Sequence, residues 1–118
     1  MDISSPADII HAHDLAIVIF TRGLHFHYDS LGYGDTGDWV VDREVLSSVN
    51  KVIIYWRDEK SGSNRIFLGK YIGAQKLPDR NRYKIRFSEL KEIGTTSLNW
   101  SEFANSGQNP VSYLGDFV

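Results

Sequence analysis

The stretch of residues 51–87 constrains the fold most, because three consecutive runs in it have the residue pattern of β-strands. Residues 51–57 (KVIIYWR) and 65–75 (RIFLGKYIGAQ) are rich in β-branched and aromatic side chains, and the polar segment 58–64 between them predicts a hairpin with a long loop. Residues 82–87 (RYKIRF) then alternate strictly between charged and apolar side chains. Strands joined by short turns predict an antiparallel sheet at the centre of the fold.

The segments before this stretch predict one more strand and short helices. Residues 15–20 (LAIVIF) are a continuous apolar run, which is typical of a strand buried on both faces. Ser5 and Asp42 are residue types that begin helices, so a short helix is expected after each. The glycine-rich segment 30–38 predicts a flexible loop, and 39–41 a short strand.

Several smaller features complete the expected fold. Gly69 and Gly73 predict bulges or bends within their strand. Ser97 is expected to begin a further helical turn, and the tail 108–118 to pack back on the core. With 118 residues, the chain has the length of a single domain. We therefore expect one α+β domain over residues 1–118: a small curled antiparallel sheet or β-barrel with short peripheral helices.

The chain contains no cysteine, so disulfides and thiolate metal sites are excluded. We find neither a signal peptide nor an apolar run long enough to cross a membrane. These features favour a cytoplasmic protein with no membrane partner. No standard catalytic or nucleotide-binding motif is present, which favours a role without catalysis and without a cofactor.

The net charge of −2 conceals a strong asymmetry along the chain. Residues 1–50 carry two basic and eight acidic residues, residues 51–91 carry eleven basic and four acidic residues, and residues 92–118 carry three acidic residues and no basic one. The basic charge is thus concentrated in the most β-like part of the chain, which points to an anionic partner.

Residues 82–87 show where this charge is directed. Successive side chains of a strand point to opposite faces, so Arg82, Lys84 and Arg86 should form an exposed row of cations while their apolar neighbours face the core. Such a row suits a phosphate backbone. We expect Arg65 and Lys70 on the preceding strand, and Lys76 and Arg80 in the turn that follows it, to extend this row.

Large rings and histidines supply the remaining candidates. Exposed aromatic rings stack on bases, so a basic and aromatic surface favours nucleic acid. In a strand, His25 and His27 would point the same way, with Asp29 continuing the row, and this spacing suits metal ligands. Ordinary surface histidines would show the same pattern, so the metal site remains one of two interpretations.

Residues 39–103 resemble the PUA-like superfamily, in particular its EVE and ASCH-type domains. The similarity rests on the tryptophan-led segment 39–43 (WVVDR), on the hairpin formed by 51–55 and 66–73, and on the strand 82–87. The resemblance implies a PUA-like β-barrel that recognises RNA or a modified base in DNA. It further implies a base-stacking pocket lined by Trp39 and Tyr55 and a phosphate contact at Arg43. We expect the large ring of Trp100 to take part in the stacking as well.

We therefore expect a non-catalytic module that binds DNA or RNA through Arg43, Arg65, Lys70, Arg82, Lys84 and Arg86. One alternative is a protein-interaction module, in which acidic and basic halves pair in a homodimer or with a catalytic partner protein. The other alternative is a metal-dependent hydrolase or nuclease that uses His25, His27 and Asp29.

Overall fold

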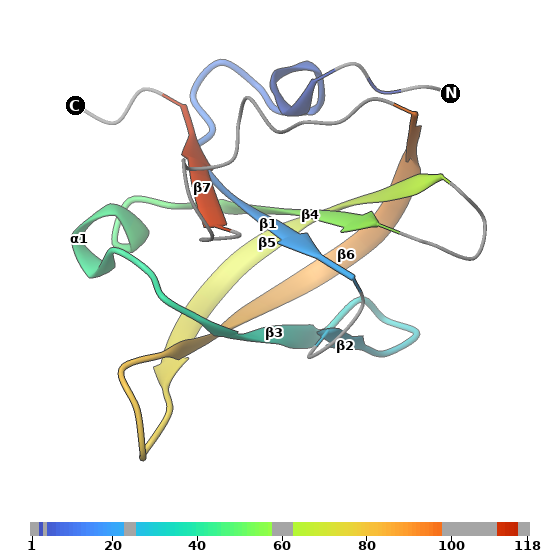
Figure 1. The fold of residues 1–118 in the computed structure, drawn as a ribbon. Helices are drawn as coiled ribbons and strands as arrows, with labels where there is room; N and C mark the ends of the chain where they lie inside the picture. Colours follow the sequence, from blue (N-terminus) through green and yellow to red (C-terminus); the bar gives the residue numbers. More distant parts are fainter. Residues whose placement is uncertain (1–2, 4, 23–25, 58–62, 98–110, 116–118) are drawn as a thin grey trace.

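The computed structural model describes residues 3, 5–22, 26–57, 63–97 and 111–115, and their strands form one seven-stranded sheet (Figure 1). The spatial order of the strands is β2-β3-β6-β5-β4-β1-β7. In chain order they are β1 (Ala16–Thr21), β2 (Phe26–Tyr28), β3 (Gly34–Trp39), β4 (Lys51–Arg57), β5 (Asn64–Lys76), β6 (Tyr83–Thr96) and β7 (Val111–Leu114).

The pairing of the strands departs from the predicted antiparallel sheet at one place. β1 and β4 run parallel, because the chain passes through β2, β3 and a short helix before it enters β4 from the end at which β1 began. All other neighbouring strands are antiparallel. β2 and β7 form the two ends of the sheet and do not pair with each other, so the described strands make an open mixed sheet and not a closed barrel.

Helices contribute little to the described part of the chain, so the domain is mostly β where an α+β domain was expected. The 3-10 helix η1 (Pro6–Ile9) begins after Ser5, whose hydroxyl accepts a hydrogen bond from the Ala7 amide. Helix α1 (Arg43–Leu46) begins after Asp42, whose carboxylate accepts from the amides of Glu44 and Val45. Both predicted helix starts are confirmed, while the turn expected after Ser97 extends outside the described residues.

The sheet curls until its distant strands meet. Phe26 of β2 lies 5.3 Å from Phe67 of β5 and 5.9 Å from Trp56 of β4, measured between ring centroids, although β2 and β4 are separated by three strands in the sheet. Figure 1 shows β5 and β6 bending across the molecule to allow this. Register shifts at Gly69 and Gly73 produce the bend, as the sequence predicted.

The curl gives the sheet a concave and a convex face, and each has its own core. The concave core includes Ile17, Ile54, Phe67, Ile85 and Phe87, together with Leu46 of α1. The convex core is smaller, includes Ile53, Tyr55 and Ile66, and is covered by Ile3, Ile9 and Ile10 of the N-terminal segment. β1 contributes to both cores, which confirms that this strand is buried on both faces.

The glycine-rich segment 30–38 is not a flexible loop, because most of it belongs to β3. A Cβ on Gly34 would collide with the His27 carbonyl oxygen of β2, and a Cβ on Gly37 would lie 2.9 Å from Cγ of Lys84 on β6. The glycines therefore allow β3 to pack closely between its neighbours.

Candidate nucleic-acid interface

The alternation of buried and exposed side chains predicted for residues 82–87 is confirmed in β6. Tyr83, Ile85 and Phe87 are buried on the concave face. Three exposed cations, which we call the cation row, lie on the convex side: Arg82 just before β6, then Lys84 and Arg86 within it. A strand with one apolar and one charged face thus presents three positive side chains to solvent.

The surroundings of the cation row leave it accessible. Lys84 lies opposite Gln75 of β5, and Arg86 lies between Gly73 of β5 and Asp35 of β3. Within the described part of the chain, neither Lys84 nor Arg86 forms an ion pair. The Asp35 carboxylate instead lies 3.7 Å from Nδ1 of His27. Lys84 and Arg86 are therefore not neutralised by the carboxylates that the structure describes.

The cation row belongs to a projecting ribbon formed by the end of β5 and the start of β6 (Figure 1). Residues 76–86 contain five basic residues and one acidic residue. Lys76 tightens the turn of this ribbon, because its ammonium donates to the carbonyl oxygens of Leu77 and Arg80. The most basic part of the chain is thus also its most protruding described element, which suits contact with a large anionic partner.

Two cations that were expected to extend the row are engaged elsewhere. Arg65 lies on the concave side, where its guanidinium makes two 2.8 Å hydrogen bonds to Glu92 and sits 4.4 Å from the centre of a Trp56 ring. Lys70 pairs with Glu89 at 3.1 Å. Both contacts neutralise the positive charge locally, so these two side chains are not part of the proposed interface.

The base-stacking residues implied by the resemblance do not share a pocket. Tyr55 is 2% exposed within the convex core and has no open ring face. Trp39 packs against the concave core, and its indole nitrogen donates to the hydroxyl of Thr36. The two rings therefore lie on opposite faces of the sheet, while Trp100 lies outside the described residues.

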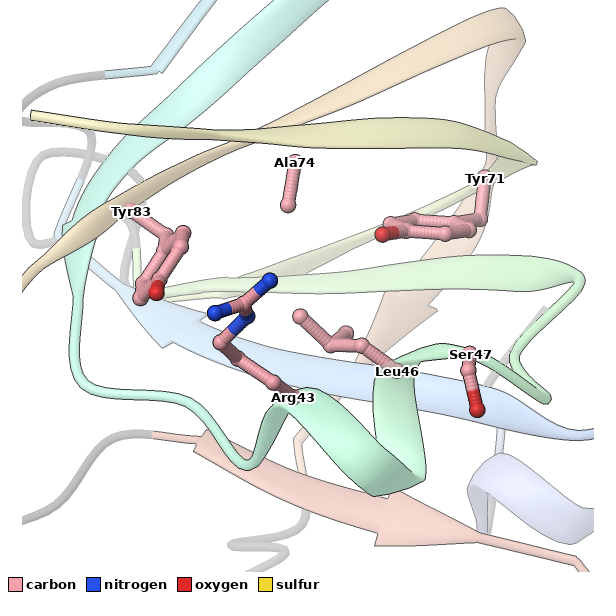
Figure 2. Close-up of a pocket in the computed structure, with 6 residues that line it drawn as sticks. All are labelled: Arg43, Leu46, Ser47, Tyr71, Ala74 and Tyr83. Atoms are coloured by element: carbon pink, nitrogen blue, oxygen red, sulfur yellow. The ribbon is translucent and has the colours of Figure 1, made fainter.

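A different cavity, of about 290 Å³, lies between α1 and the concave side of the β5–β6 ribbon (Figure 2). Its lining residues are Arg43, Leu46, Ser47, Tyr71, Ala74 and Tyr83. Burial raises the pKa of Tyr71, and the neighbouring Tyr113 raises it further. This phenol is therefore neutral at physiological pH and able to donate a hydrogen bond. Only Tyr83 of this lining could be anticipated, because the alternation in residues 82–87 directs its side chain inward.

The histidine hypothesis finds no support where the structure can address it. His27 and Asp29 are exposed, and His25 lies outside the described residues. Among the residues that are described, no group of three or more histidine, aspartate or glutamate side chains is placed to bind a metal ion. The Asp29 carboxylate accepts hydrogen bonds from the amides of Leu31 and Tyr33, and so closes the β2–β3 turn.

The chain matches no family model, and no curated protein or solved structure matches it either. None of the helices in the described ranges is long and apolar enough to cross a bilayer. The interpretation of function therefore rests on the geometry and charge of the two surfaces described above.

Proposed function

We propose that this domain is a nucleic-acid-binding module without catalytic activity, in which the cation row contacts the phosphate backbone. The observation that carries the proposal is the placement of Arg82, Lys84 and Arg86 on one exposed face of the projecting ribbon. Three like charges at this spacing repel one another, and an anionic backbone laid across them would relieve that repulsion.

An exposed aromatic ring beside the row supports the same function. Tyr33 lies one residue before β3 and has the parity of Asp35, which pairs with Arg86. Its side chain is 55% exposed. A ring at this position can stack on a base whose phosphate lies against the row, an arrangement that favours single strands. The PUA-like relationship and recognition of a modified base remain predictions.

A binding screen with a charge-reversal variant tests this proposal. Labelled single- and double-stranded DNA and RNA are titrated with the wild-type protein and with the variant Arg82→Glu, Lys84→Glu, Arg86→Glu, at low and at physiological salt. The wild type should bind at least one class of nucleic acid, and the variant should lose most of that affinity because repulsion replaces attraction. Equal affinity of the two proteins would refute the role of the row.

Protein binding is a second candidate function, favoured by apolar side chains at the β2–β3 turn. Leu31 is 74% exposed in the β2–β3 turn, and Tyr33, two residues later, is 55% exposed. Exposed apolar side chains at one turn are candidates for an interaction surface. Light scattering of the wild type and of Leu31→Asp, at low and high salt, distinguishes the candidates. A dimer that persists at high salt and is lost in Leu31→Asp would favour the interaction module, because salt screens charge pairs and does not weaken apolar contacts.

A further inference from the structure

The cavity beneath α1 has a donor-rich and acid-free lining. Figure 2 shows the Arg43 guanidinium directed toward the cavity between the two phenol rings, Tyr71 and Tyr83. The Ser47 hydroxyl donates instead to the Glu44 carbonyl oxygen at 2.6 Å. One guanidinium and two phenols thus face the space, and none of the six lining residues is acidic.

The charge of Arg43 has no counter-ion within the described part of the chain. A guanidinium has a planar set of donors that matches the oxygens of a phosphate, and charge-assisted hydrogen bonds of this kind are among the strong ones. Tyr71 can add a donor, because its burial first and Tyr113 second raise the pKa of this phenol, which stays protonated. The polar half of the cavity is therefore suited to an oxyanion.

The other half of the cavity is suited to a ring. Leu46 and Ala74 form its apolar lining, and the rings of Tyr71 and Tyr83 lie on either side of it. The volume of about 290 Å³ is at the small end of ligand pockets, which span about 300–1,000 Å³. A ligand of one ring system with one charged group fits these features.

The cavity and the cation row occupy opposite faces of the same ribbon. Tyr83, which lines the cavity, lies between Arg82 and Lys84 in the strand. A nucleic-acid strand whose phosphates follow the cation row would have to pass around the ribbon to reach the cavity. Only the end of that nucleic-acid strand can therefore enter the cavity. Such an end carries a sugar and a base, and a terminal phosphate where it is phosphorylated.

We propose that this cavity binds a phosphate monoester attached to a ring, with Arg43 on the phosphate and the two tyrosines beside the ring. The ligand is either the phosphorylated terminal nucleotide of a strand or a free nucleoside monophosphate. The first source rests on the proposed nucleic-acid function, whereas the second does not.

Calorimetric titrations test the site with adenosine, adenosine monophosphate and one oligonucleotide that is unphosphorylated, 5′-phosphorylated or 3′-phosphorylated. A phosphate should strengthen binding by about 10- to 100-fold, as expected for hydrogen bonds to a charged group. The variant Arg43→Gln should remove this difference, and the double variant Tyr71→Phe, Tyr83→Phe should reduce it while leaving both rings in place. Arg57→Gln, an exposed cation outside the cavity, is the matched control.

The pattern of results separates the two ligands and the two proposals. Preference for one phosphorylated end over the monophosphate identifies a strand end, and equal binding of both identifies a free nucleotide. No gain from phosphate in either series, or an unchanged gain in Arg43→Gln, overturns the cavity proposal. Salt-dependent binding of the unphosphorylated strand depends on the row alone, so its loss or survival reports separately on the proposed function.

Discussion

Arg65 is a cation that stabilises the fold, whereas the cations of the row are proposed to bind nucleic acid. Replacing Arg65 therefore tests whether the two groups of cations have different roles. Its guanidinium is bound in two ways, by two hydrogen bonds of 2.8 Å to Glu92 and by stacking at 4.4 Å over Trp56. Because it lies on the concave side, it cannot reach a ligand bound along the cation row. The variant Arg65→Met should therefore lower stability and leave nucleic-acid affinity unchanged.

The size of the stability loss follows from the two contacts. Stacking of a guanidinium at an exposed ring contributes about 0.5–1 kcal/mol. The ion pair contributes about 0.2–1 kcal/mol, in the lower part of that range because the Arg65 and Glu92 side chains are 28% and 37% exposed. Their sum is about 1–2 kcal/mol, which corresponds to a decrease in Tm of about 4–8 °C for a domain of this length.

Urea unfolding of Arg65→Met, Glu92→Gln and the double variant measures this loss. Glu92→Gln should cost less than Arg65→Met, because it removes the ion pair and leaves the guanidinium on Trp56. The double-mutant cycle should give a coupling of about 0.5 kcal/mol. If Arg65→Met had wild-type stability and a weaker salt dependence of binding, the distinction between the two groups of cations would be wrong.

Three further predictions address the fold and the stacking ring. Gly32→Ala should lower the free energy of unfolding in urea by about 1–3 kcal/mol, because Gly32 has a φ of 85° and its added Cβ would lie 2.6 Å from a backbone nitrogen of β6; a neutral substitution would contradict that geometry. The His11 amide and the Asn50 side chain lower the pKa of Asp14 below its ordinary 3.8, so its contribution to stability should be complete above pH 3.8 and disappear as the pH falls through the lower folded-state pKa. Asp14→Asn should flatten the stability profile in that acidic range, and an unchanged profile would rule out Asp14 as its source. Tyr33→Ala should weaken binding of single strands by about 5- to 100-fold while Tyr33→Phe retains it, and equal anisotropy titrations of the two variants would exclude stacking.

The strands in the middle of the chain could be predicted because their signals are local. Residues 51–57 were expected as a strand from composition alone and form β4 with the same bounds. The alternation in 82–87 predicted which side chains of β6 are buried, since a strand directs successive residues to opposite faces. Gly69 and Gly73 were expected at bends and lie at register shifts.

The features that the sequence could not supply depend on distant parts of the chain. Glycines such as those of β3 predict flexibility when they are read from the sequence alone, whereas in the fold they allow close contact with β2 and β6. Arg65 meets Glu92 across 27 positions only because β5 and β6 pair with shifted register. The cavity could not be predicted either, because it forms only where α1 lies over the β5–β6 ribbon. Periodicity predicts the direction of a side chain and not its partner.

If the cation row contacts phosphates, its charges must set the salt dependence of nucleic-acid binding. Two double variants remove two positive charges each: Lys84→Gln with Arg86→Gln within the row, and Arg57→Gln with Lys91→Gln outside it. If the three cations of the row contact phosphates of a duplex, a plot of log K against log salt should have a slope of about −2.7, and the row variant about −0.9.

Between 50 and 200 mM salt, the wild type should then lose about 40-fold in affinity and the row variant about 3- to 4-fold. For a single strand the two slopes would be about −2.1 and −0.7. Only the row variant should flatten the slope, while the control variant should match the wild type. Equal slopes in all three proteins, or flattening by the control pair alone, would show that the cation row does not contact phosphates.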